Sequence, residues 1–462
     1  MAALSAGLLA GANGAGLRLA LKRYFATEDY APRDQEIPIL KCHGQPEKTE
    51  KNEMSFYDPL ETRDPEEREA DLMDKLARQV AHAKETTHYY FQSLAGINPF
   101  DCVSRGALAK LPLTRKRDLI DLQKKTPPFG GLNALARSKA KRVFASPGPI
   151  YELQGGEMDH WRLARALYAA GFRHGDLIHN CYAYHLTPGA FMMEGGARKL
   201  GCSVFPGGTG QTEQQVQAMV DLRPEGYVGT PSFLRIIVEK AEELGADISS
   251  LKKALVSGEA LPGATRAWLN ERGITVRQCY ATADIGAIAY ETEAEQGMIV
   301  EEEVLLEIVR PGTGEPVPPG EVGEVVVTTF NPDYPLIRFA TGDLSAILSG
   351  RSPCGRTNIR LKGWMGRADQ TTKIKGMFVH PEQIAEIANR HPEIQRMRLV
   401  VDNMSGQDRM VLHCEIEPGY EALDSALQAS LRDVTKLRGE VAFSAPGGLP
   451  NDGKVIEDSR IY

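Results

Sequence analysis

Between Arg142 and Tyr290, short apolar runs alternate with segments of helical spacing, and this alternation restricts the fold more than any other feature. The apolar runs include 177–178, 204–205, 227–228 and 254–256, and the helical segments include 211–222 and 232–244. Strands that alternate with helices form βαβ units and a largely parallel sheet. We therefore predict an α/β fold in which ligands bind at the carboxyl ends of the strands.

After Glu301 the pattern changes to antiparallel strands and then to a small α+β unit. Two strands, at 305–309 and 323–328, are joined by a Gly/Pro turn. The last stretch, of about 90 residues, has the length of a small domain. Its predicted elements after a first strand are a helix, two strands and a second helix, at 381–390, 398–401, 411–416 and 423–437.

The chain has 462 residues, which is too long for one core. We predict an extension at 1–53, a large domain at 54–368 and a small C-terminal domain at 369–462. At the start of the large domain, apolar residues at helical spacing predict an amphipathic helix over 64–92.

The first 26 residues contain no acidic residue and carry Arg18, Lys22 and Arg23, a composition that mitochondrial transit peptides share. The polar stretch 45–53 lacks the apolar residues needed for a core and is typical of a linker. We interpret residues 1–53 as a disordered extension. The expected location is cytoplasmic, with the mitochondrial matrix as the alternative if the first residues direct import.

Charge and cysteine usage exclude several classes of protein. The formal net charge is −7, and there is no basic block to neutralise nucleic-acid phosphates. The seven cysteines include no C-x-x-C pair, which favours a reduced intracellular protein without structural zinc. No apolar run approaches the roughly 20 residues that cross a bilayer. We expect a soluble protein that binds small molecules and neither nucleic acid nor membrane; the oligomeric state is open, a homodimer included.

Near the C-terminus, residues 450–456 (Pro-Asn-Asp-Gly-Lys-Val-Ile) contain a Gly-Lys pair, and three other motifs precede it. In order they are 280–284 (Tyr-Ala-Thr-Ala-Asp), 338–344 (Arg-Phe-Ala-Thr-Gly-Asp-Leu) and 366–369 (Gly-Arg-Ala-Asp), the last followed by 373–376 (Lys-Ile-Lys-Gly). From about Asp58 to Tyr462 this order resembles the adenylate-forming superfamily, most closely its phenylacetate–CoA ligase branch. The resemblance implies a large adenylate-forming domain with mixed βαβ sheets and a small mobile C-terminal lid domain.

The same resemblance implies an AMP-forming acid–CoA ligase that uses ATP, Mg²⁺ and CoA, with an aryl acid such as phenylacetate as substrate. Such an enzyme joins a carboxylate to the α-phosphate of ATP, and the CoA thiol then attacks the acyl-adenylate. Two like-charged groups must meet in the first step, so the site needs positive charge at the phosphate. Lys454 matches the family's adenylation lysine in position, and lysine is a compact charge on a long stem.

Several residues match the family's nucleotide site. Asp343 matches the carboxylate that accepts both ribose hydroxyls. Tyr280 matches the aromatic residue beside the adenine, and Asp284 matches the acid that holds Mg²⁺. Thr282 stands one residue before the family's phosphate-contacting hydroxyl. The other nucleotide-binding candidates implied by the resemblance are Gly258, Glu259, Ala260 and Arg367.

The phosphate loop departs furthest from the family pattern. Relatives carry a Ser/Thr/Gly-rich loop that ends in Gly-Lys and holds the outer phosphates. Here Ser146 and Gly148 match, but two prolines remove amide donors, Glu152 adds negative charge, and the lysine is missing. We therefore expect either weak binding of the triphosphate or substitute groups elsewhere in the chain.

The resemblance assigns the remaining site residues to three groups. The acid pocket is expected at Tyr182, Tyr184, His185, Gly207 and Gly208, the CoA loop at Lys375 and Gly376, and the hinge between the domains at Asp369. Two alternatives to an acid–CoA ligase stay open. One is an adenylating enzyme with another acyl acceptor, and the other is a non-catalytic nucleotide- or acyl-CoA-binding relative.

Overall fold

The computed structural model describes residues 56–146, 149–368, 372–374, 377–402, 409–417, 419 and 423–460. The predicted extension at 1–53 lies outside these residues. The chain from Ser55 to Tyr462 forms one compact unit. Within the described ranges, no helix is both long and apolar enough to cross a membrane.

The largest sheet has nine strands in the order β14-β15-β10-β9-β8-β7-β6-β4-β5. Its parallel half consists of β4 (Leu177–Asn180), β5 (Ser203–Phe205), β6 (Gly226–Gly229), β7 (Lys253–Val256) and β8 (Thr275–Thr282). Its antiparallel half consists of β9 (Gly286–Tyr290), β10 (Met298–Val300), β14 (Ile347–Leu348) and β15 (Arg360–Leu361). The parallel strands coincide with the apolar runs of the sequence, so the predicted α/β fold is confirmed.

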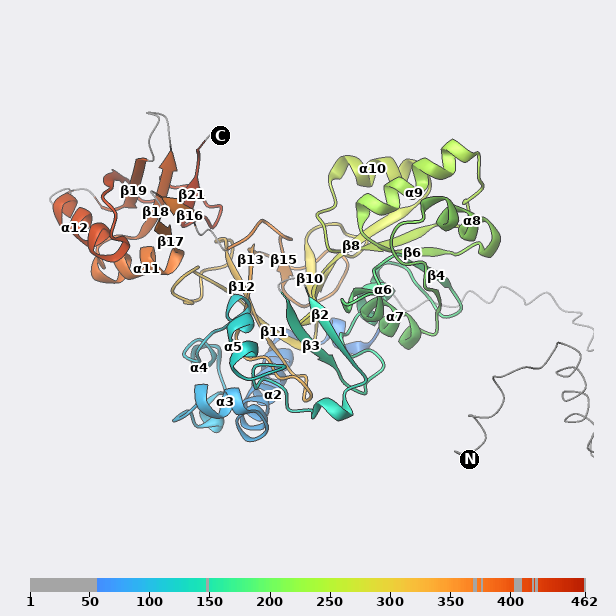
Figure 1. Ribbon diagram of the computed structural model, residues 1–462, viewed down its shortest axis with the longest axis horizontal. Helices are drawn as coiled ribbons and strands as arrows, with labels where there is room; N and C mark the ends of the chain where they lie inside the picture. The colour runs from blue at the N-terminus through green and yellow to red at the C-terminus, as the bar shows by residue number, and fades with distance from the viewer. Residues whose placement is uncertain are drawn as a thin grey trace, which may run out of the picture. The chain divides into compact units, whose positions relative to one another are not determined.

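Helices cover both faces of the parallel strands (Figure 1). On one face, α6 (Ala164–Ala169) and α7 (Gly189–Leu200) share a core with Val228 and Leu255. On the other face, α8 (Thr212–Leu222), α9 (Pro231–Leu244) and α10 (Gly263–Glu271) share a core with Tyr227 and Ala254. Neighbouring strand residues therefore enter opposite cores, which is why these strands are continuously apolar in sequence.

A second sheet has the order β1-β13-β12-β11. The predicted antiparallel pair is β11 (Val304–Val309) with β12 (Gly323–Thr329), and β13 (Phe339–Ser345) pairs antiparallel with β12. The short strand β1 (Thr114–Arg115) pairs parallel with β13. It lies in sequence between α4 (Arg105–Leu108) and α5 (Leu119–Lys125). Asp343 thus belongs to β13, and β1 brings the residues that follow it to the same sheet.

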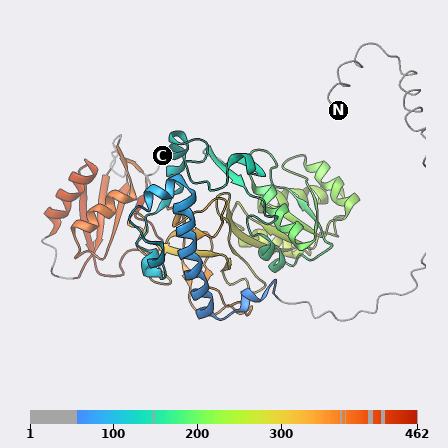
Figure 2. The same ribbon diagram turned by 90° about the horizontal axis from the view of Figure 1, so that it is seen from below.

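The helix predicted over 64–92 is two helices, α2 (Pro65–Thr86) and α3 (His88–Ser93). Figure 2 shows α2 as the long blue helix. The break falls at Thr87, whose backbone is extended, with φ −122° and ψ 139°, and whose hydroxyl accepts a hydrogen bond from the Tyr90 N–H. Threonine is a common N-cap because its side chain satisfies an N–H that has no partner in the first helical turn.

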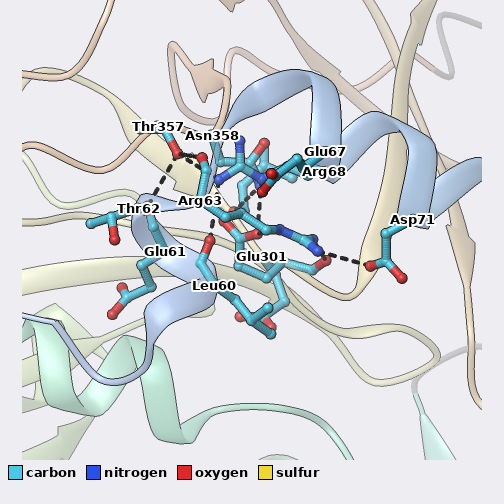
Figure 3. A network of polar contacts seen from close by, with 12 residues as sticks. Leu60, Glu61, Thr62, Arg63, Glu67, Arg68, Asp71, Glu301, Thr357 and Asn358 are labelled. Atoms are coloured by element: carbon cyan, nitrogen blue, oxygen red, sulfur yellow. Dashed lines mark hydrogen bonds and ion pairs between the residues drawn. The ribbon is translucent and has the colours of Figure 1, made fainter.

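A buried network of charges attaches the start of α2 to the segment between β10 and β11 (Figure 3). Arg63 Nε and Arg68 Nε both bind Glu302 Oε2, at 3.2 and 2.8 Å, and Arg68 Nη2 also donates to Thr357 Oγ1 at 2.7 Å. Glu302 is fully buried. Removing one partner from such a network leaves an uncompensated buried charge, so these contacts hold residues 57–68 in place.

The region predicted as the phosphate loop begins as a β-hairpin. Strands β2 (Arg142–Ser146) and β3 (Ile150–Gln154) pair antiparallel, with Phe144 opposite Glu152. Gly148, which stands between these strands in the sequence, lies outside the described residues.

The C-terminal residues form their own four-stranded sheet and core, with strand order β20-β19-β18-β21. The strands are β18 (Arg396–Asp402), β19 (Arg409–Glu415), β20 (Glu440–Ser444) and β21 (Ile456–Asp458), and a separate hairpin pairs β16 (Thr372–Ile374) with β17 (Met377–Val379). Helices α11 (Pro381–Arg390) and α12 (Asp424–Thr435) match the two helices predicted there. The predicted domain boundary, and its hinge residue Asp369, fall outside the described residues.

Candidate active site

Asp343 is bound by three donors from two parts of the chain. Its Oδ2 accepts from Tyr280 Oη at 2.8 Å, and its Oδ1 accepts from Arg367 Nη1 at 2.9 Å and from Trp364 Nε1 at 3.1 Å. Burial, together with the Asp343 carboxylate, holds the pKa of Tyr280 well above its ordinary value, so Tyr280 stays a neutral donor. Both oxygens of Asp343 are thus oriented, and a pair of hydroxyl groups could exchange with the present donors.

Gly342 explains how the Arg367 guanidinium reaches Asp343. Residues 366–368 run beside β13, where the Ala368 N–H donates to the Gly342 carbonyl at 2.7 Å. Gly342 has φ +76°, and a Cβ there would lie 2.6 Å from Arg367 Nη2. The left-handed backbone favours glycine, and a Cβ would force the exposed end of the Arg367 side chain to shift. The glycine that precedes Asp343 therefore leaves room for the guanidinium where it now lies.

The predicted adenine loop, Gly258–Ala260, is exposed and follows β7. Immediately before it, Ser257 Oγ donates to the Cys279 carbonyl at 2.7 Å and so ties the end of β7 to β8. Tyr280 lies on β8 next to Cys279. The loop and Tyr280 therefore meet at the carboxyl ends of adjacent parallel strands, where open α/β sheets bind ligands.

Thr282 ends β8, and Asp284 lies in the turn that follows. Thr282 Oγ1 accepts from the Ile285 N–H at 3.2 Å and so stabilises the turn itself. The Asp284 side chain is fully buried, and its Oδ2 forms an ion pair with Lys116 Nζ. Lys116 begins the short 3₁₀ helix Lys116–Asp118 directly after β1. Burial lowers the pKa of Lys116, but the Asp284 carboxylate more than offsets this, and the pKa is raised.

Glu152 lies beside this ion pair, inside β3 rather than in a loop. It is 2% exposed, and its Oε1 accepts from Ser146 Oγ at 2.6 Å. Burial and the neighbouring Asp284 carboxylate hold the pKa of Glu152 well above its ordinary value. The hairpin therefore turns the carboxyl group of Glu152 inward, toward Asp284 and Lys116.

Asp284 fits a role in holding Mg²⁺, because its Oδ1 is buried and has no hydrogen-bond partner within the described residues. Carboxylate oxygens are the ligands that this hard cation prefers. The described part of the chain contains no group of three or more His, Cys, Asp or Glu side chains that could hold a metal.

Asn180, buried at the end of β4, connects the predicted acid-pocket residues. Its Nδ2 donates to Tyr184 Oη at 3.0 Å, and its Oδ1 accepts from the Tyr182 N–H at 3.1 Å. Its carbonyl accepts from the Gly208 N–H at 2.9 Å. His185 is exposed and is not part of this group. No motif in the sequence singles out Asn180, although it contacts three of the predicted residues.

Gly207 is packed against two polar side chains. Gln215 Nε2 donates to the Gly207 carbonyl at 2.9 Å, and Gln215 Oε1 lies 2.5 Å from His179 Nε2. A Cβ on Gly207 would lie 2.5 Å from Gln215 Oε1 and 2.8 Å from His179 Nε2, so glycine is required here. Burial lowers the pKa of His179 and keeps the ring neutral.

Lys454 has an exposed side chain on a fixed backbone. Its N–H donates to Asp452 Oδ1 at 3.1 Å, and its carbonyl accepts from Arg398 Nε at 3.2 Å. It lines a pocket of 290 Å³ together with Arg367. The other predicted C-terminal site residues, Asp369, Lys375 and Gly376, lie outside the described ranges.

Residues 172–331 match the family model of the AMP-binding enzymes. Phenylacetate-coenzyme A ligase of Aromatoleum evansii is 34% identical over 78% of this chain and 84% of its own length. The ligase of the same name from Thermus thermophilus is 33% identical over 82% of this chain and 90% of its own length.

Among solved structures, an open conformation of 2-hydroxyisobutyryl-CoA ligase in complex with 2-HIB-AMP and CoA matches with a TM-score of 0.67 and 25% identity. The match covers 88% of this chain and 95% of that chain. Together with the order of the motifs around Asp343, these similarities show that the chain belongs to the phenylacetate–CoA ligase-like family of adenylate-forming enzymes.

Proposed function

We propose that this chain, an ATP-dependent acid–CoA ligase of the AMP-forming type, activates an aryl acid such as phenylacetate. In the first step a carboxylate oxygen of the acid attacks the α-phosphorus of ATP, and pyrophosphate leaves. In the second step the CoA sulfur attacks the acyl carbon, and AMP leaves. The names of the curated relatives, all phenylacetate-coenzyme A ligases, support the choice of acid.

The hydrogen bonds around Asp343 are the observation that carries this proposal. Asp343 offers two oriented oxygens, and Trp364 and Arg367 both bind one of them. Both donors are about half exposed: Trp364 at 51% of its residue area and Arg367 at 53% of its side-chain area. Exposed donors of this kind can give way to the two hydroxyls of a ribose. Tyr280 and the loop 258–260 then lie on the adjacent strands, where the adenine would bind.

Two charged residues are assigned to the phosphates of the nucleotide. Asp284 would hold Mg²⁺, which neutralises the phosphates when it is bound. Lys454, with its exposed side chain, would supply positive charge at the α-phosphate while the new P–O bond forms. The predicted roles of Lys375 and Gly376 toward CoA and of Asp369 as a hinge remain part of this proposal.

The aryl group is proposed to bind beside β4, near Tyr182 and Tyr184. The Tyr184 ring packs edge-on against Phe191, with ring centres 5.2 Å apart, and Asn180 fixes its hydroxyl. Aromatic walls held in this way match a flat aryl group, because aromatic rings prefer edge-to-face or offset packing.

Because the phosphate hairpin departs from the family pattern, two alternatives to an acid–CoA ligase have to be tested. One is an adenylating enzyme with another acyl acceptor, and the other is a non-catalytic binding protein. Pyrophosphate release should be measured over a panel of aryl and alkyl acids, with and without CoA. We expect release that requires ATP and an aryl acid and increases with CoA. Release indifferent to CoA indicates another acceptor, and no release with any acid indicates a binding protein. A cytoplasmic location and a homodimer stay predictions.

A further inference from the structure

The loop 450–454 ends in Lys454 and is held against the C-terminal sheet by the side chain of Arg398. Arg398 lies on β18 and is 3% exposed. Its Nε donates to the Lys454 carbonyl at 3.2 Å, and its Nη2 donates to the Pro450 carbonyl at 3.2 Å and forms an ion pair with Asp452. These bonds fix the backbone of the loop relative to the sheet that carries it.

One side chain of this loop, Asn451, reaches beyond the C-terminal sheet to the turn before β12. Asn451 Oδ1 accepts from the Val322 N–H at 3.1 Å, and Asn451 Nδ2 donates to the Gly320 carbonyl at 3.2 Å. The turn is itself fixed, because the Gly320 N–H donates to the Ile347 carbonyl at 3.0 Å. Asn451 is exposed, so these two bonds hold its amide in place. An amide that uses both its donor and its acceptor on one stretch of backbone favours a single orientation of the loop.

Gly453 brings the same loop against β13. A Cβ on Gly453 would lie 2.6 Å from Val322 Cγ1 and 3.2 Å from Leu344 Cδ2, and its φ of +71° favours glycine. Leu344 follows Asp343 in β13, so the loop lies next to the strand that carries the proposed ribose ligand. Lys454 accordingly lines the same pocket as Leu344.

We propose that Asn451 is a positioning residue, which holds Lys454 at the nucleotide site by attaching the loop 450–454 to the turn 320–322. The inference rests on the proposed function, because it takes Lys454 to supply positive charge at the α-phosphate. Asn451 acts through Lys454 and not on the substrate. It fixes where the ammonium group can lie, and a small displacement of a catalytic group lowers the rate steeply.

Hydrogen exchange of the Val322 amide, read at single residues in the full-length protein without substrates, tests the attachment. This N–H donates to Asn451 Oδ1, so Asn451→Ala should speed its exchange by ~10-fold or more. The exposed Asn270 at the end of α10, changed to Ala, is the matched control and should leave the exchange as in the wild type. Equal exchange in the wild type and Asn451→Ala overturns the attachment.

The positioning role is tested on the two half-reactions. With saturating ATP and aryl acid and without CoA, Asn451→Ala should form the acyl-adenylate ~10-fold more slowly than the wild type. Thioester formation from synthetic acyl-adenylate and CoA should stay close to the wild-type rate, because Lys454 is assigned to the first step. A wild-type rate of adenylate formation overturns the positioning role. An equal loss in both half-reactions also overturns it, since that result indicates a general defect of the folded chain.

Coupling between Asn451 and Lys454 is the signature that a merely structural role would not produce. In a chain that already carries Lys454→Ala, the further change Asn451→Ala should hardly slow adenylate formation, because the ammonium group that it positions is gone. Losses that multiply in full show that Asn451 acts independently of Lys454 and refute the inference.

These outcomes separate the positioning role from the proposed function. A wild type that forms adenylate, but whose rate and Val322 exchange do not respond to Asn451→Ala, refutes the positioning role alone. A wild type that forms no adenylate with any aryl acid refutes the proposed function, and the exchange of the Val322 amide still decides whether Asn451 attaches the loop.

Discussion

Replacing Asp343 with alanine removes the carboxylate that we propose binds the ribose hydroxyls. Two charge-assisted hydrogen bonds contribute roughly 1.5–3 kcal/mol each, or about 3–6 kcal/mol together. The nucleotide must first displace Trp364 Nε1 and Arg367 Nη1, which bind Asp343 at 3.1 and 2.9 Å. The net loss should therefore be about 2 kcal/mol, which corresponds to ATP binding weaker by roughly 30-fold.

Calorimetric titrations of the wild type and Asp343→Ala with ATP and 2′-deoxy-ATP measure this loss. The missing 2′-hydroxyl should cost the wild type about 1 kcal/mol and the variant far less, because the bond it would make is already absent. If the two losses add in full, the proposed contact does not exist. Folding should be little affected, because Tyr280 Oη keeps Thr341 Oγ1 at 3.3 Å and the Arg367 side chain is 53% exposed.

Three other changes test separate parts of the chain. Lys454→Ala should slow adenylate formation by ~100-fold or more but hardly affect thioester formation from synthetic acyl-adenylate. Each half-reaction can be followed by chromatography of its product, and equal losses of rate in the two would contradict the role of Lys454. Gly342→Ala should lower the melting temperature, because Gly342 has φ +76° and an added Cβ would lie 2.6 Å from Arg367 Nη2; an unchanged melting temperature would contradict this strain. Burial raises the pKa of Glu301 from 4.5 to about 7, although Arg165 opposes this. The folded state then holds the Glu301 proton more tightly than the unfolded state does, so the stability that this proton contributes is complete below about pH 4.5 and is lost as the pH rises through about 7. In urea unfolding over this range, the free energy of unfolding of the wild type should fall by up to ~3 kcal/mol relative to that of Glu301→Gln. Parallel pH profiles of the two proteins would refute this.

The elements that sequence analysis predicted well are those whose burial leaves a clear pattern. Tyr227 and Val228 on β6 enter opposite cores, so the strand is continuously apolar and easily recognised. Helix α11 begins at Pro381, a residue that favours the first turn of a helix. The break at Thr87 could not be predicted in the same way, because the residues on both sides continue a helical pattern. The contact that marks the break, from the Tyr90 N–H to the Thr87 hydroxyl, is visible only in the structure.

The site was predictable where its residues sit in motifs and was missed where contacts join distant segments. Asp343 and Tyr280 were both selected from motifs, and the structure joins them by a hydrogen bond of 2.8 Å. Lys116 lies 168 residues from its partner Asp284, so no local pattern connects them. The inward position of Glu152 left no such signal either, because β3 does not alternate between its faces: residues 150 and 152–154 are buried, and Tyr151 is the exposed residue of the strand.

The central claim, that the chain forms an acyl-adenylate and passes it to CoA, is tested most directly by single-turnover mass spectrometry. The protein would be mixed with ATP, Mg²⁺ and phenylacetate without CoA, quenched, and then compared with a sample that receives CoA before quenching. We predict phenylacetyl-adenylate in amounts that match the protein in the first sample. In the second sample we predict its conversion to phenylacetyl-CoA and AMP. A protein that binds ATP but yields no adenylate with any aryl acid, or an adenylate that CoA leaves unchanged, would contradict the claim.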